Sequence, residues 1–165
     1  MKTKLFSVLF LCLPVILFAG PEEILSESFS FLNYTENELT NNGAAVISEI
    51  DLRRLGLNLT RHFLLEKDGK RYVFITNNGI ITSVEIRDYY NDFSDNERFK
   101  NDIILARQLI SGMNGRENTS VYSDFRILSF TAVLDRIIEL SIAFNYDYPE
   151  NRESWSGWMT VKVSR

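Results

Sequence analysis

Three consecutive segments between residues 57 and 87 alternate apolar and polar side chains, and two turn motifs separate them. A period of two is typical of strands with one buried face. The dipeptides Asp68-Gly69 and Asn78-Gly79 favour the positive φ angles of tight hairpin turns. The pattern therefore predicts a meander of three antiparallel strands. The first strand is predicted to bury Leu57, Leu59, Phe63 and Leu65. The second is predicted to span Tyr72 to Thr76, and the third to place Ile80, Val84 and Ile86 on one face.

A helix is predicted next, over residues 94–112. Ser94 and Glu97 have the spacing of a capping box, in which each side chain bonds the other residue's backbone amide. Apolar residues then recur at helical spacing, and Gly112 supplies a stop signal. The apolar stripe consists of Phe99, Ile103, Ala106, Ile110 and Met113, with Leu109 beside it.

Three further strands are predicted in the last third of the chain. Residues 124–134 are apolar on both faces, which suggests a central strand covered on both sides. Residues 136–148 alternate cleanly, and the segment from Trp155 to Val163 forms the last strand. Nearer the N-terminus, residues 28–34 look like a strand, and residues 44–55 fit either a strand or a short helix.

Together these elements predict an α+β fold. We expect one strongly curved antiparallel sheet of roughly six to eight strands with meander connections, and one long helix packed on a face. A small closed β-barrel is the structural alternative.

The first nineteen residues have the pattern of a secretory signal peptide. Lys2 and Lys4 precede an apolar stretch from Leu5 to Phe18, and the small pair Ala19-Gly20 follows it. This stretch is shorter than the roughly 20 residues of a membrane-spanning helix, and no later segment is apolar enough to span a membrane. We therefore predict one globular domain over residues 20–165.

The segment 1–19 also contains Cys12, which is the chain's only cysteine. Small secreted domains of eukaryotes usually carry disulfides, so a domain without cysteine better fits a bacterial periplasm or cell surface. Cleavage removes two lysines and no acid, and so lowers the formal net charge from −4 to −6. Such an acidic surface disfavours binding to nucleic acid or to anionic lipid.

The sequence offers little support for catalysis or metal binding. His62 is the only histidine, and no nearby residue marks it as a general base or ligand. The acidic residues Asp88, Asp92, Asp95 and Glu97 do not have the spacing of an EF-hand loop. We predict no catalytic residue, no metal and no cofactor.

Aromatic residues are the remaining signal. Trp158 alternates with Thr160 and Lys162, which places it on the polar face of its strand. Exposed tyrosine and tryptophan offer large, rigid contact areas for a protein or a small molecule, although packing between neighbouring strands is the simpler explanation. The candidate binding residues are Trp158, Tyr148, Tyr146, Tyr90 and Tyr89.

The leading hypothesis is thus an exported envelope protein without enzymatic activity, which binds an unidentified protein or small-molecule partner through the aromatic end of its sheet. One alternative is a hydrolase whose site uses carboxylates or His62. Another is a carrier that holds a small apolar ligand in a cavity of the sheet.

Overall fold

A computed structural model describes residues 20–90, 96–122, 125–145 and 157–165 of the chain. The predicted signal segment 1–19 and the predicted capping residue Ser94 lie outside these ranges. The elements along the chain are α1 (Pro21–Phe31), α2 (Glu36–Asn41), β1 (Ala45–Asp51), the 3₁₀ helix η1 (Arg53–Leu55), β2 (Leu59–Lys67), β3 (Lys70–Asn77), β4 (Ile80–Tyr90), α3 (Asn96–Gly112), β5 (Arg116–Val121), β6 (Phe125–Val133), β7 (Ile137–Asn145) and β8 (Gly157–Ser164).

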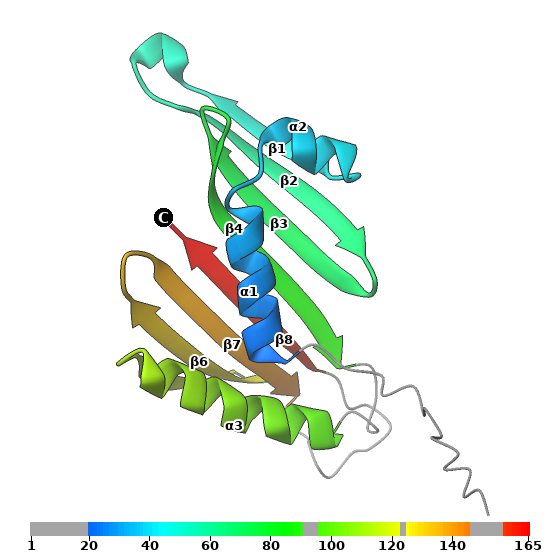
Figure 1. Ribbon diagram of the computed structural model, residues 1–165, viewed down its shortest axis with the longest axis vertical. Helices are drawn as coiled ribbons and strands as arrows, with labels where there is room; N and C mark the ends of the chain where they lie inside the picture. Colours follow the sequence, from blue (N-terminus) through cyan, green and yellow to red (C-terminus); the bar gives the residue numbers. More distant parts are fainter. Residues whose placement is uncertain (1–19, 91–95, 123–124, 146–156) are drawn as a thin grey trace, which may run out of the picture.

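The strands form one open antiparallel sheet in the order β1-β2-β3-β4-β8-β7-β6-β5. The predicted α+β class, strand number and meander connections are confirmed, and the sheet is not a closed barrel. Two meanders of four strands each follow a helix, and they join through their last strands, β4 and β8 (Figure 1). The architecture is thus repeated although the sequence shows no clear repeat.

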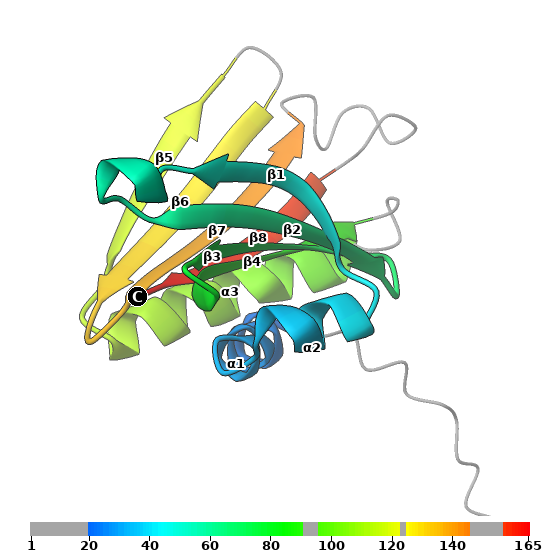
Figure 2. The ribbon, with the colours of Figure 1, turned by 90° about the horizontal axis from the view of Figure 1, so that it is seen from above.

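All three helices lie on one side of the sheet, as the view from above shows (Figure 2). The core fills the layer between them, because alternate residues of each strand turn toward the helices. Its largest side chains, each less than 2 % exposed, are Phe63, Phe74, Phe130, Ile24, Leu32, Leu39, Ile81, Ile86, Ile138, Leu140, Ile142 and Met159. The other side of the sheet has no helical cover among the described residues (Figure 2).

Each helix also presents one carboxylate to a hydroxyl group of the sheet. A basic side chain accompanies each of these bonds: Lys70 for α1, Arg61 for α2 and Arg98 for α3. Buried polar groups need such partners, so the bonds fix where the helices sit on the sheet. The carboxylate–hydroxyl pairs are Glu27–Tyr72 from α1 (3.0 Å), Glu36–Thr76 from α2 (2.5 Å) and Asp102–Tyr90 from α3 (2.9 Å).

Several sequence-based predictions are corrected by the structure. Residues 28–34 are not a strand: residues 28–31 complete α1, whose buried positions Ile24, Leu25 and Ser28 have helical spacing. Residues 44–55 form β1 and then η1, so both readings of that segment were partly right.

The third strand of the meander contains an irregularity that the alternation did not reveal. The register shifts between Ile75 and Thr76, so that Thr76 pairs with Ile81. Ile81 is therefore buried, whereas the predicted core residue Ile80 is 57 % exposed. Leu57 likewise lies before β2 and is exposed.

β6 is not a central strand. It is second from the edge of the sheet, and no described helix covers its second face. Helix α3 ends at Gly112 as predicted, but Asn114, with a φ of 54°, adopts the left-handed conformation that closes the turn.

Candidate functional site

The helix-free face of the sheet carries the residues that alternate with the core. Because the strands are antiparallel and in register, its side chains form rows that cross the strands. One row contains Arg87 on β4, Thr160 on β8, Ser141 on β7, Ser129 on β6 and Asn118 on β5. Three short hydroxyl side chains on three adjacent strands thus lie side by side.

The first four residues of this row form the floor of a hollow of about 400 Å³, which we call the hydroxyl groove. The row on one side is mostly charged and contains the ion pair Lys162–Glu139 at 2.7 Å, and its Glu85 also pairs with Arg87 of the floor at 3.3 Å. The row on the other side contains Trp158 and Ile127. The groove is lined by Glu85, Arg87, Ile127, Ser129, Phe130, Thr131, Glu139, Leu140, Ser141, Trp158, Thr160 and Lys162.

The three hydroxyls of the floor are free to bind. Within the part of the chain that the structure describes, the side chains of Ser129, Ser141 and Thr160 make no hydrogen bond. A hydroxyl group offers one donor and two acceptor positions. The floor can therefore both donate to and accept from a polar ligand, beside an apolar surface that can contact its carbon atoms.

Trp158 lies against its neighbours rather than standing free. Its ring is 5.1 Å from that of Phe125, and the Arg87 guanidinium carbon is 5.6 Å from its centroid. Ala143, directly opposite Trp158 on β7, is only 1 % exposed although it lies on the helix-free face. Aromatic side chains thus make a small second core beside the groove.

The structure brings two of the five predicted binding residues together and separates a third. Tyr89 pairs with Trp158 across β4 and β8, so both lie on the helix-free face. Tyr90 points to the other face, where it is 3 % exposed and donates a hydrogen bond to Asp102. Burial and this carboxylate raise the pKa of the Tyr90 hydroxyl. Tyr146 and Tyr148 lie outside the described residues.

The other residues considered for chemistry do not converge on the groove. His62 lies half-buried on β2, two strands away from β4, and is not among the groove's lining residues. Asp88 forms an ion pair with Arg98, and Glu97 forms one with Lys100. Asp92 and Asp95 lie outside the described ranges. Among the described residues, no group of three histidine, cysteine or acidic side chains is arranged to hold a metal ion.

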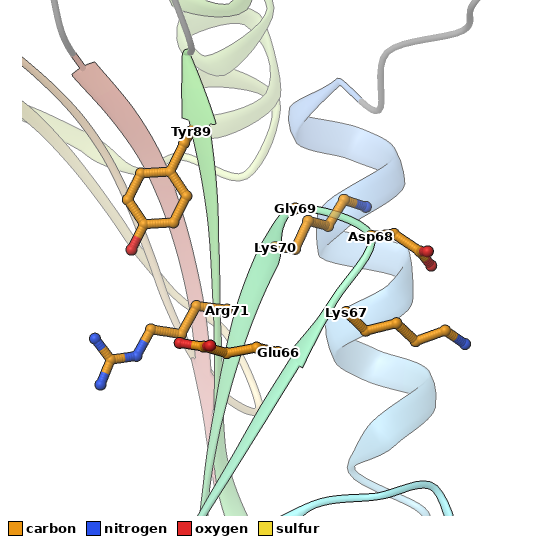
Figure 3. A pocket seen from close by; sticks show the side chains of 7 residues that line it. All are labelled: Glu66, Lys67, Asp68, Gly69, Lys70, Arg71 and Tyr89. Carbon is orange, nitrogen blue, oxygen red and sulfur yellow. The ribbon is translucent and has the colours of Figure 1, made fainter.

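A second hollow of about 380 Å³ lies at the hairpin between β2 and β3, and we call it the hairpin hollow. Figure 3 shows Tyr89, Arg71 and Glu66 on one side of this hairpin, with Lys67, Asp68 and Lys70 toward α1. Arg71 is the cross-strand neighbour of Arg87, which lines the hydroxyl groove. Two neighbouring arginines therefore line the two hollows, one in each.

The sequence pattern places Thr160 and Lys162 on the polar face of the last strand, but it does not identify the groove residues as a site. The alternation of each strand contains this signal. Alternation within a strand does not reveal the pairing of β4 with β8, which places residues more than 70 positions apart in one row.

Comparison of the chain with protein-family models, with curated proteins and with solved structures finds no match. No helix within the described ranges is long and apolar enough to cross a membrane.

Proposed function

We propose that this chain is an exported binding protein of the bacterial envelope, without enzymatic activity, and that it holds a polar ligand in the hydroxyl groove. The observation that carries the proposal is the row of three hydroxyls on the groove floor, Ser129, Ser141 and Thr160, which have no hydrogen-bond partner among the described residues. Ligand sites typically combine an apolar surface with a few convergent polar groups. The signal-like segment 1–19 supports export.

Binding has more support than catalysis at this site. The groove's charged side chains form two ion pairs, and all four side chains are partly exposed. A general base instead needs an environment that shifts its pKa toward neutrality, which usually requires burial. The lone histidine, His62, lies away from the groove.

The carrier alternative has less support as well. An apolar ligand would need space between sheet and helices, where large side chains such as Phe63, Phe74 and Phe130 are fully buried. Interiors packed by such side chains leave few voids larger than a water molecule. The hydroxyl groove instead lies on the opposite face of the sheet, and polar and charged side chains make up most of its lining.

The proposal can be tested by filling the groove. Ser141→Tyr places a bulky ring on its floor, whereas Ser48→Tyr makes the same change on the same face at exposed β1, outside the groove. The protein is purified from the envelope of its own cells, and small molecules released on denaturation are identified by mass spectrometry. We expect a compound that accompanies wild type and S48Y but is lost from S141Y. A compound retained by S141Y, or none in wild type, would contradict the proposal.

A further inference from the structure

Two arginines stand directly opposite each other on the helix-free face. Arg71 on β3 pairs with Arg87 on β4 in the antiparallel ladder. Side chains in such positions have Cβ atoms about 4.5–5.5 Å apart, and like charges there destabilise the sheet. In a chain with a formal net charge of −4, this pairing is a local concentration of positive charge.

Neither guanidinium is fully satisfied. The Nε–H groups of Arg71 and Arg87 are shielded from water, and neither has a hydrogen-bond partner in the described structure. Arg87 donates one bond, at 3.3 Å, to Glu85 and lies beside the Trp158 ring. Within the described ranges, Arg71 forms no hydrogen bond or ion pair at all. A buried donor without a partner costs free energy.

The surroundings leave room for a ligand group at these arginines. Arg71 lines the hairpin hollow, Arg87 lines the hydroxyl groove, and Tyr89 stands beside them on the same face. Glu66 is the cross-strand neighbour of Arg71 on β2, yet it makes no ion pair within 4.0 Å of it (Figure 3). Lys70 is engaged on the other side of the hairpin, 3.2 Å from Glu27 of α1.

We infer that Arg71 and Arg87 together bind an anionic group, a phosphate or a carboxylate, of the ligand that the hydroxyl groove holds. The planar fork of guanidinium donors matches the oxygens of either group. An anion between the two arginines would remove their repulsion and satisfy their donors. This inference rests on the proposed function, and it narrows the ligand to an acidic molecule with hydrogen-bonding groups.

The test is thermal unfolding in phosphate, in acetate and in chloride at equal ionic strength. Phosphate stabilises most proteins because it is excluded from their surface, so the readout is the difference between variants. Arg71→Gln removes half of the pair. Arg116→Gln is the matched control, since Arg116 is an exposed arginine on the same face, on β5.

We expect saturating phosphate to raise the Tm of wild type and R116Q by about 2–4 °C more than that of R71Q. The same difference in acetate would extend the site to carboxylates, and its absence there would restrict the site to phosphate. In chloride, R71Q should be at least as stable as wild type, because the substitution relieves repulsion. Equal responses of R71Q and R116Q to both anions, or a marked loss of stability of R71Q in chloride, would overturn the inference.

Different results would contradict the anion site at the two arginines and the ligand site in the hydroxyl groove. If R71Q responds like R116Q while S141Y still loses its bound compound, the groove binds a ligand but the arginines do not hold its acidic group. If phosphate acts through Arg71 while no compound depends on the groove, the anion site stands alone and the proposed ligand site is wrong.

Discussion

The hydroxyl of Tyr90 donates a hydrogen bond to Asp102 across the interface between β4 and α3, at 2.9 Å. Both side chains are buried, and the Arg98 guanidinium lies 5.1 Å from the Tyr90 ring and 3.7 Å from the Asp102 carboxylate. The polar cluster of Tyr90, Asp102 and Arg98 thus anchors helix α3 to β4, in the middle of the sheet. Tyr90 is a structural residue, although its neighbour Tyr89 lies on the helix-free face and lines the hairpin hollow.

Removing the Tyr90 hydroxyl should destabilise the fold. In Tyr90→Phe, the buried Asp102 carboxylate loses its hydroxyl donor, which should lower the free energy of unfolding by about 1–3 kcal/mol. Tyr72→Phe is the comparison, because its partner Glu27 is partly exposed and keeps Lys70 at 3.2 Å. Urea unfolding of both variants measures the difference. A loss in Y72F as large as that in Y90F would refute this account of the cluster.

Alkaline pH should destabilise the protein through these two tyrosines. Burial first, and then the adjacent carboxylates, raise the pKa of the Tyr72 and Tyr90 hydroxyls above the ordinary value near 10. The native state therefore retains protons that the unfolded state loses, so this contribution to stability is complete below about pH 9 and falls as pH rises past about 10.

Tyrosinate absorbance, recorded beside circular dichroism, checks this expectation. Tyr72 and Tyr90 should stay protonated until the chain unfolds, and the double variant with phenylalanine at both positions should show a shallower loss of stability above about pH 10. Ionisation of all seven tyrosines in a chain that keeps its native circular dichroism would contradict it.

Two glycines near the end of α3 should respond oppositely to alanine. A Cβ at Gly115 would lie 2.7 Å from the Thr131 carbonyl oxygen and 2.5 Å from Ile110 Cγ2, so Gly115→Ala should destabilise the turn into β5. Gly112 has no atom within 4 Å of such a Cβ and ends a helix, so Gly112→Ala should be neutral or stabilise by up to about 1 kcal/mol. Thermal unfolding of both variants tests this expectation. Equal changes in Tm for G112A and G115A would show that the turn adapts to the added Cβ.

Trp158 should matter for stability as well as for the site. Trp158→Ala removes the ring that packs on Phe125 and Arg87, beside the buried Ala143, and should cost about 1–3 kcal/mol. Trp158→Phe keeps part of this contact and should lose less. Chemical unfolding of both variants tests the ranking. An unchanged stability of W158A would instead show that the ring belongs to the binding surface alone.

The meander of β2, β3 and β4 could be predicted because local signals specify it. Asp68-Gly69 and Asn78-Gly79 have positive φ angles at all four residues, as their hairpin turns require. Helix α3 was equally visible from its apolar stripe. Helix α1 was not predicted, although Pro21 and two acids mark its first turn, because residues 28–34 look like a strand.

The position of β6 in the sheet and the residues of the hydroxyl groove could not be predicted from local sequence patterns. β6 is apolar on both faces because Phe125 packs with Trp158 on the helix-free side, and not because a second layer of helices covers the strand. The groove itself depends on the pairing of Arg87 with Thr160 and of Ser129 with Ser141. Alternation predicts which face of the sheet a side chain occupies. Its neighbours on the adjacent strands, however, depend on the strand order.

Site-specific photo-crosslinking, in the cells that make the protein, measures whether the hydroxyl groove holds a ligand. One variant carries the photoreactive residue at Ser129 on the groove floor, and the control carries it at Ile104, which is 51 % exposed on α3. We predict that Ser129 captures one defined compound and Ile104 does not, and that S141Y abolishes the capture. Equal labelling from both positions, or capture that S141Y leaves unchanged, would contradict the claim.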